Sequence, residues 1–330
     1  MEFWTGVQGT IKTRKMPGSL ATGYDSFVNG AKEAEALGFD GYGAGEHHFM
    51  YDSTMPLAVQ ALAAAAAVTS RIRFVTGAML LPQYDPLEAA ELAATVDVVS
   101  GGRVTLGLGM GYRPYEFDGL SMEKKARGAR LVEGMKVFEQ ATSGERFSFE
   151  GRYYSYDNAC VRPTPIQRPI PTWFCGGTSV RAAQRAGKAG LPYWMANASF
   201  EQASAIAREY REVGRAAGWP EERLRLAAFK DVCIGDTVEE AEELKQLLLS
   251  DLYEEHILCF GYLVDDEGNH LYHPPKDHPV YRRFVDSIYT GTVEMIIDEF
   301  RRYEGMGFEA LFLMTAQREL IAEHIIPEFK

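Results

Sequence analysis

Apolar and polar residues alternate between two spacings along the whole chain, one typical of strands and one typical of helices. Short apolar runs such as RIRFVTGAMLL (71–81) and VTLGL (104–108) predict buried strands. Longer stretches follow them in which apolar residues recur three and four positions apart, as in residues 24–37. The pattern therefore predicts repeated strand–helix units.

Eight such units account for most of the chain. The predicted strands are 3–7, 39–44, 71–81, 104–108, 172–175, 191–196, 225–234 and 308–314. The predicted helices are 24–37, 57–69, 87–99, 122–141, 180–189, 201–217, 238–249, 292–306 and 317–329. Eight alternations favour an α/β fold of the (β/α)8 TIM-barrel type. The alternative is a Rossmann-like sheet with a cap, but the chain shows no second phosphate-binding half to support it.

Two segments interrupt the alternation of strands and helices. Residues 147–156 alternate aromatic and polar side chains and predict an added hairpin. Residues 252–289 show little periodicity and several His, Pro and Asp residues. We therefore interpret residues 250–290 as an insertion between strands seven and eight, and as a candidate lid, within one domain that spans residues 1–330.

The composition is that of a soluble globular enzyme, with 46% hydrophobic and 24% charged residues. Lys and Arg number 34 against 46 Asp and Glu, and without a basic run this balance argues against nucleic acid as a partner. No charged-then-apolar leader opens the chain, and its longest apolar run, 58–68, is too short for a bilayer. We expect a cytoplasmic protein with no membrane partner.

Residues 38–48, GFDGYGAGEHH, are the first candidate for chemistry. Glu46, His47 and His48 follow the second strand directly, and catalytic side chains of barrel enzymes lie at the carboxyl ends of strands. A histidine titrates near neutral pH and can act as a general base or a hydrogen-bond donor. We expect at most one of the two histidines to face a reacting centre; the alternative is a loop histidine held by Glu46 or by backbone groups.

The second candidate is a turn with the sequence Gly176-Gly177-Thr178-Ser179, which lies between the fifth strand and a helix. Two glycines, two hydroxyls and a helix N-terminus together favour a phosphate. Simple helix capping is the alternative interpretation.

Two further patterns are weaker signals. The glycine run 107–111 is not followed directly by a helix, so we reject a dinucleotide fingerprint and expect its glycines to leave room for a flat ring. The histidines at positions 270, 273 and 278 are interpreted as solvated loop residues, and the four distant cysteines show no CxxC spacing. No metal site or disulfide framework is predicted.

The order of several motifs along the chain resembles the bacterial luciferase-like flavin-dependent oxidoreductases. The matching stretches are 38–49, 76–86, 97–117, 127–135, 163–179 and 291–314, nearly the whole chain. The resemblance implies a (β/α)8 barrel, often dimeric, that binds FMN or a deazaflavin at the carboxyl mouth. Residues 189–194, AGLPYW, resemble the luciferase branch more than the deazaflavin-dependent members, which favours FMN.

The resemblance also implies roles for particular residues. His47 matches a histidine thought to act as a base near the flavin, and Glu116 matches a carboxylate close to that histidine. Gly77–Ala78 matches the place of a non-proline cis peptide bond against the flavin ring. Arg127 is the expected partner of the phosphate, with Arg130 as the alternative because the helix register is open.

Further cofactor contacts are expected from the same motifs. These residues are Gly109, Met110, Cys175, Gly176, Gly177, Thr178, Ser179 and Trp194. Gly109 and Met110 replace a reactive cysteine and a phosphate-binding arginine of bacterial luciferase, which argues against light emission.

The expected function is that of a two-component monooxygenase. Reduced FMN from a separate reductase would react with O2 to form a flavin C4a-peroxide, which oxygenates a small organic substrate. A homodimer is expected from the habit of the family and from the alanine-rich second helix. The alternatives are a deazaflavin-dependent hydride-transfer enzyme and a flavin-binding relative without turnover.

Overall fold

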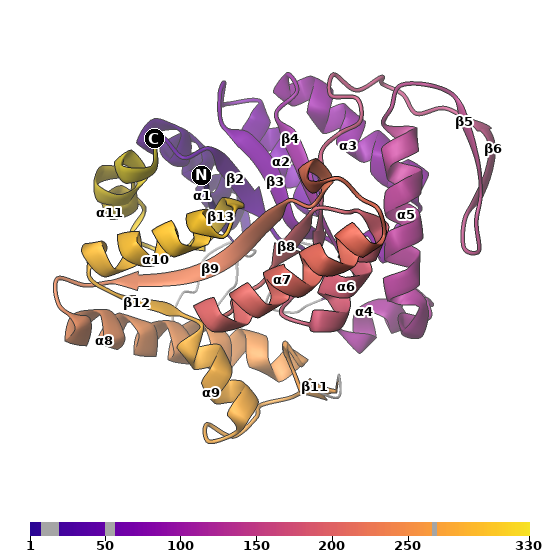
Figure 1. Ribbon diagram of the computed structural model, residues 1–330. Helices are drawn as coiled ribbons and strands as arrows, with labels where there is room; N and C mark the ends of the chain where they lie inside the picture. Colours follow the sequence, from indigo (N-terminus) through magenta and orange to yellow (C-terminus); the bar gives the residue numbers. More distant parts are fainter. Residues whose placement is uncertain (8–19, 50–56, 266–268) are drawn as a thin grey trace.

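Eight parallel strands close into a barrel in the computed structural model, which describes residues 1–7, 20–49, 57–265 and 269–330 (Figure 1). The strands pair in the order β1-β2-β3-β4-β7-β8-β9-β13, and β13 pairs back with β1. Their bounds are β1 (Glu2–Val7), β2 (Gly41–Ala44), β3 (Arg73–Met79), β4 (Val104–Gly109), β7 (Thr172–Cys175), β8 (Tyr193–Met195), β9 (Leu226–Ile234) and β13 (Phe308–Met314). The predicted (β/α)8 barrel is confirmed.

Helices cover the outside of these strands (Figure 1). The main ones are α1 (Leu20–Leu37), α2 (Ala58–Ala66), α3 (Pro86–Ser100), α5 (Arg127–Ala141), α6 (Val180–Ala189), α7 (Phe200–Ala216), α8 (Val238–Leu248) and α10 (Val293–Gly305). Local sequence fixes their ends: Asp85 caps α3, Ser199 caps α7 and Thr237 caps α8 through side-chain oxygens. Gly101 and Gly190 end α3 and α6 in left-handed backbone conformations.

The barrel interior is filled by aromatic side chains rather than left open. Trp4 lies 5.6 Å from Trp194 between ring centroids, and Phe312 lies 5.8 Å from Phe229. The backbone around these rings is correspondingly tight. At Gly43, β2 lies so close to the carbonyl of Val75 in β3 and to the ring of Phe312 that a side chain would not fit. The interior is therefore a packed core, and any site must lie at one end of the barrel.

The predicted helix 122–141 is wrong at its start. A separate short helix, α4 (Pro114–Gly119), comes first, followed by a 3-10 turn at Lys124–Ala126 and then α5. Pro114 occupies the first turn of α4, where its missing N–H costs nothing. The predicted closing helix 317–329 is also irregular, because α11 (Arg318–Leu320) continues as a π-helical and then a 3-10 turn.

The two predicted interruptions are both present as additions to the barrel. The hairpin forms from β5 (Phe147–Glu150) and β6 (Ser155–Ala159), which pair antiparallel and project beside α5 (Figure 1). The insertion, residues 250–290, contains part of a π-helical turn (Leu249–Ile257), β10 (Leu263–Val264), β11 (His270–Leu271), α9 (Pro279–Asp286) and the start of β12 (Tyr289–Gly291). The helix α9 was not predicted, because eight residues give too short a pattern.

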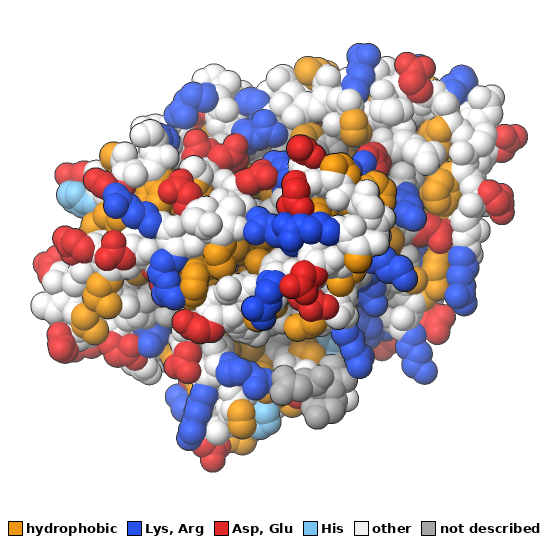
Figure 2. All heavy atoms as spheres, viewed as in Figure 1, with side chains coloured by type: hydrophobic (Ala, Val, Ile, Leu, Met, Phe, Trp, Pro, Cys, Tyr) orange, Lys and Arg blue, Asp and Glu red, His pale blue; other side chains and the backbone are white. Residues whose placement is uncertain are grey.

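The surface carries both signs of charge. On the face shown in Figure 2, acidic and basic side chains are interspersed rather than separated by sign. Such mixing avoids the large single-sign field that would steer a polyanion to this face. Among the described residues, no helix is long and apolar enough to cross a bilayer.

Replacement of Gly43 tests how tightly the barrel closes. A Cβ atom at this position would overlap the carbonyl oxygen of Val75, which is backbone and cannot rotate away. We expect Gly43→Ala to lower the free energy of unfolding by about 1–3 kcal/mol or more in urea denaturation. The matched control is Gly305→Ala, because a Cβ at Gly305 in α10 meets nothing within 4 Å. Equal stability of the two variants would contradict this packing.

Candidate active site

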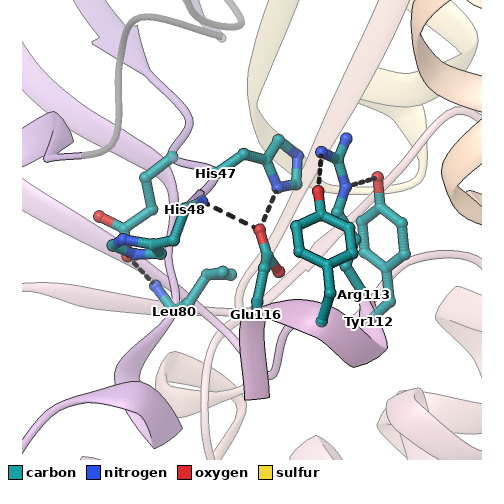
Figure 3. A network of polar contacts seen from close by, with 8 residues as sticks. His47, His48, Leu80, Tyr112, Arg113 and Glu116 are labelled. Atoms are coloured by element: carbon teal, nitrogen blue, oxygen red, sulfur yellow. Dashed lines mark hydrogen bonds and ion pairs between the residues drawn. The ribbon is translucent and has the colours of Figure 1, made fainter. Parts of the chain in front are cut away.

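His47 and Glu116 meet at the end of β2. The strand stops at Ala44, and the bend that follows brings His47 Nδ1 to 3.0 Å from Glu116 Oε1 on α4 (Figure 3). The same carboxylate oxygen accepts a hydrogen bond from the backbone N–H of His48 at 3.1 Å. Glu116 is fully buried, whereas the side chain of His47 keeps 28% of its surface exposed. The carboxylate therefore holds a histidine that can still be reached.

A second pair, Glu46 and His48, lies beside the first. Glu46 is buried and accepts hydrogen bonds from the backbone N–H of Leu80 at 2.6 Å and from the hydroxyl of Tyr84 at 3.3 Å. Its Oε1 atom lies 3.5 Å from His48 Nε2. The alternative of a loop histidine held by Glu46 therefore applies to His48, whereas His47 is held by Glu116.

The two histidines differ in their proton affinity. Burial lowers the pKa of His47, although the hydrogen bond with Glu116 acts in the opposite direction. Burial alone would also lower the pKa of His48, but the hydrogen bond and charge of Glu46 outweigh it, so that the pKa is raised. At neutral pH His47 is accordingly the histidine with the weaker hold on a proton, and its neutral form can accept one.

The segment after β4 connects this pair to the insertion. The ring of Tyr112 lies 5.7 Å from the ring of His47, edge to face. From the insertion, His270 stacks on Tyr112 at 6.0 Å and Tyr262 contacts it at 6.2 Å. Arg113 is fully buried and donates to the hydroxyl of Tyr112 at 3.1 Å. The insertion therefore packs directly over the neighbours of His47.

The ends of β3 and β8 form a closely packed floor. The Gly77–Ala78 peptide bond is cis, as the resemblance implies. A Cβ on Gly77 would lie 3.1 Å from the ring of Trp194, and one on Gly109 would lie 2.9 Å from Ala78 Cβ. These residues lie together at the barrel mouth. Trp194 and Ala78 take the space that side chains at Gly77 and Gly109 would need, so a flat group would lie against this packed floor.

Two other predicted contact residues, Cys175 and Met110, are partly buried against the core. Cys175 ends β7 with its sulfur beside Gly107, and burial raises the pKa of its thiol far above the usual range. A thiol in this state is a packing group rather than a nucleophile. Met110, directly after β4, packs partly buried against the main core.

The predicted phosphate turn joins β7 to α6. Gly177 has φ +66°, a left-handed conformation that favours glycine, and its carbonyl accepts a hydrogen bond from the hydroxyl of Tyr193 at 3.0 Å. Thr178 follows it, and Ser179 occupies the N-cap position of α6. The Ser179 side chain makes no capping hydrogen bond, so the capping interpretation does not describe it. A free hydroxyl and a ten-residue helix N-terminus suit an anion.

Arginines from α5 and from α6, the helix that this turn leads into, lie close to each other. Arg127 donates to the carbonyl of Lys124 at 3.0 Å, and its buried Nε has no hydrogen-bond partner among the described residues. Burial and then the charge of Arg185 lower the pKa of Arg127. The guanidinium of Arg185, on α6, packs against Gly128 at the start of α5. Arg130 instead lies over the ring of Tyr154, 5.1 Å from its centroid.

These features fit a phosphorylated, planar cofactor of the flavin type. The turn at Gly176 and the cation of Arg127 suit the phosphate, the floor at Gly77 suits the ring, and His47 lies at the same mouth. Sequence reasoning missed Arg185, because an arginine on an exposed helix carries no motif. Among the residues that the structure describes, no group of three His, Cys, Asp or Glu is arranged to hold a metal ion.

The sequence matches known proteins over most of its length. A model of the luciferase-like monooxygenase family matches residues 1–310. The FMNH2-dependent dimethylsulfone monooxygenase of Pseudomonas putida is 24% identical over 98% of this chain and 93% of that protein. The uncharacterized protein y4vJ of Sinorhizobium fredii is 30% identical over 54% of this chain, and the match spans 44% of its length.

Solved structures share the same architecture. The oxygenating constituent of 3,6-diketocamphane monooxygenase from Pseudomonas putida, in complex with FMN, has a TM-score of 0.77 at 20% identity over 99% of this chain and 98% of that chain. An F420-dependent secondary alcohol dehydrogenase with an F420-acetone adduct has a TM-score of 0.74 at 19% identity over both full chains. At these identities the similarity shows the fold.

Glu116→Gln tests the coupling between the buried carboxylate and His47. Glutamine keeps an acceptor oxygen but loses the negative charge that favours the imidazolium form. We therefore expect the pKa of His47 to fall further, measured by NMR titration of the imidazole protons. Glu46→Gln is the matched control, which should lower the pKa of His48 and, because a less charged His48 repels the imidazolium of His47 less, should not lower that of His47. A His47 pKa that stays constant or rises in Glu116→Gln would refute the coupling.

Proposed function

We propose, from the premise that this chain belongs to the luciferase-like monooxygenase family, that it is a flavin-dependent monooxygenase. In this proposal it uses reduced FMN and O2 to oxygenate a small organic substrate. The observation that carries the proposal is the hydrogen bond between His47 and the buried Glu116, at the same barrel mouth as the Gly176 turn. Bound FMN would supply the electrons and the carbon that reacts with O2.

His47 is the proposed proton carrier. Its Nδ1 atom faces the Glu116 carboxylate, which accepts the hydrogen bond and so favours the tautomer with the proton on Nδ1. The Nε2 atom is then left with a lone pair for a proton from the substrate or from the reacting oxygen. Glu116 holds the imidazole in this orientation, a role that its complete burial suits.

The Gly176 turn and Arg127 are proposed to hold the phosphate of FMN. The turn contributes the hydroxyls of Thr178 and Ser179 and the start of α6, and Arg127 contributes a guanidinium with a free Nε. Arg185 adds a second positive charge beside it. The floor formed by Gly77–Ala78 and Trp194 would face the ring.

A deazaflavin-dependent hydride transfer is the second candidate function. It is supported by the shared fold with the F420-dependent secondary alcohol dehydrogenase. The similarity of residues 189–194 to the luciferase branch favours FMN instead. The two candidates differ in whether O2 is consumed.

A separate reductase and a second copy of the chain are the proposed partners. In the proposal this domain carries only the oxygenase site, so another protein must supply the reduced FMN. A dimer is supported by exposed valines, which are Val98 and Val99 in the last turn of α3 and Val68 just after α2. The insertion is proposed to cover the mouth and keep water out during turnover.

His47→Ala tests the proposed chemistry. Protein loaded with reduced FMN is mixed with O2 and a panel of aldehydes, ketones, sulfonates and aromatic compounds, and oxygenated product and H2O2 are quantified. We expect one class of compound to be oxygenated, with one O2 consumed for each product formed. His47→Ala should lower the rate of oxygenation by about 10²–10⁴-fold and leave the affinity for FMN unchanged.

The exposed His324 supplies the control for this experiment, and His324→Ala should match the parent protein. Full coupled activity in His47→Ala would remove His47 from the scheme. Tight deazaflavin binding without O2 uptake would favour hydride transfer, and tight FMN binding without product would indicate a relative that has lost turnover.

Arg127→Ala tests the phosphate site. A hydrogen bond to a charged group contributes about 1.5–3 kcal/mol, so the Kd for FMN should rise roughly ten- to hundredfold. Riboflavin, which lacks the phosphate, should bind both proteins equally in the same fluorescence titration. Arg130→Ala is the matched control, because its guanidinium lies over Tyr154, and it should leave both affinities unchanged. A larger loss in Arg130→Ala than in Arg127→Ala would reverse the assignment.

A further inference from the structure

Two charged residues stand next to each other inside the strand β9 and take no part in the proposed chemistry. Lys230 and Asp231 are both completely buried. Because successive residues of a strand point to opposite faces, Asp231 lies on the barrel side with Phe229, and Lys230 lies on the outer side. A buried charge is tolerated only when hydrogen bonds and opposite charges compensate its desolvation, so the partners of this pair must matter.

Asp231 ties the start of the insertion to the barrel. Its Oδ2 atom accepts a hydrogen bond from the hydroxyl of Tyr253, in the π-helical turn, at 2.5 Å. The same oxygen accepts from the side-chain amide of Asn197, and the backbone N–H of Asp231 donates to Asn197 Oδ1 at 2.9 Å. One carboxylate thus joins β9 to the insertion and to the segment after β8.

Lys230 ties the end of the insertion to the same two segments. Its Nζ donates to the carbonyl of Ser287 at 3.1 Å and to the carbonyl of Ala198. The ammonium also lies 3.6 Å from the ring centroid of Tyr289. Ser287 and Tyr289 belong to the return of the insertion into the barrel, whereas Ala198 follows Asn197 directly. Two consecutive residues of β9 therefore hold both ends of the insertion.

The insertion otherwise packs into an apolar cluster that it shares with Cys233 of β9 and with Leu244 and Leu248 of α8. Tyr253 packs against Phe284 with ring centroids 4.6 Å apart, and both belong to an apolar cluster separate from the main barrel core. It also contacts the site through Tyr262 and His270, which pack on Tyr112 next to His47, and through Phe260, which packs against Arg113 and Tyr115. Figure 1 shows α9 and β11 beside α8 at one side of the barrel. A unit that packs mainly on itself and on α8 can shift relative to the rest of the barrel when its attachments fail.

We propose that Lys230 and Asp231 are positioning residues, a two-point latch that holds the insertion over the barrel mouth and so keeps Tyr112 packed against His47. The environment of the pair supports this. Burial lowers the pKa of Lys230 to about 7, and the charges of Asp231 and Glu299 oppose this effect. Burial raises the pKa of Asp231 to about 6, and the hydrogen bonds from Tyr253 and Asn197 oppose it, so the charged form of Asp231 depends on these partners. Loss of a partner from the insertion would weaken that compensation and release one end.

Tyr253→Phe is the first test, because it removes one hydroxyl and keeps the ring in its apolar cluster. In flavin-free protein we expect amide hydrogen exchange of residues 250–290 to rise about tenfold or more, while exchange of β1–β4 stays unchanged. The pKa of His47, followed by NMR, should rise towards its ordinary value, since burial is what lowers it.

Tyr281→Phe is the matched control. Its hydroxyl donates to Glu254 at 2.6 Å inside the insertion, so its loss should leave the exchange of residues 250–290 at the level of the parent protein apart from the turn around Glu254, and the pKa of His47 unchanged. If Tyr281→Phe moves that pKa as much as Tyr253→Phe does, the effect is not that of a latch to the barrel, and the proposal is wrong.

Lys230→Met tests the second point. We expect the same rise in exchange, centred on the return segment near Ser287. Equal loosening of β1–β4 and the insertion would make Lys230 a general stabiliser and overturn its part of the latch. If Lys230→Met does not fold, Tyr253→Phe is the deciding variant. The proposal is then wrong if Tyr253→Phe shows the same hydrogen exchange and the same His47 pKa as the parent protein. These measurements need neither flavin nor turnover, so their outcome does not depend on whether the proposed function is correct.

Discussion

The mouth of this barrel depends on carboxylates that have no access to water. A buried carboxylate must receive hydrogen bonds or an opposite charge, because its desolvation otherwise costs several kcal/mol. Three of them lie near the carboxyl ends of strands: Glu46, Glu116 and Asp231. Each accepts hydrogen bonds from groups that are distant in the chain, although Glu116 Oε2 and Asp231 Oδ1 have no partner among the described residues. The need to compensate a buried charge therefore fixes how the loops meet above the packed interior.

The same requirement gives neighbouring histidines different properties. Glu116 lies 3.0 Å from His47, whose pKa is nevertheless lowered because burial dominates. Glu46 raises the pKa of His48 above its ordinary value. Positive charge collects at the other part of the site, where Arg185 packs against Gly128 and its charge helps to lower the pKa of Arg127. In the proposed function, the mouth thus has a proton-handling side around His47 and an anion-binding side around Arg127.

The sequence predicted the elements that have long or strongly apolar patterns. The strands 172–175 and 308–314 and the helix 180–189 match the structure residue for residue. The short helix α4 was missed, since six residues do not complete two turns and cannot show a helical period. The closeness of Glu116 to His47 spans 69 residues of sequence and came from the resemblance, because no local pattern encodes a contact of that range. Arg185 was missed for the related reason that only tertiary packing places it beside Arg127.

The sequence itself carries one signal for the latch, a charged dipeptide in an otherwise apolar strand. The strand Leu226–Ile234 is apolar except for Lys230 and Asp231, and every one of its residues is buried. A charged dipeptide in such a strand puts one charge on each face of the sheet, so both faces must offer polar partners at that height. In a barrel the inner face can do so only near the mouth, because the interior below is filled by aromatic rings. The dipeptide therefore marks where β9 leaves the packed interior and where another segment must cover it, which is the position that the insertion takes.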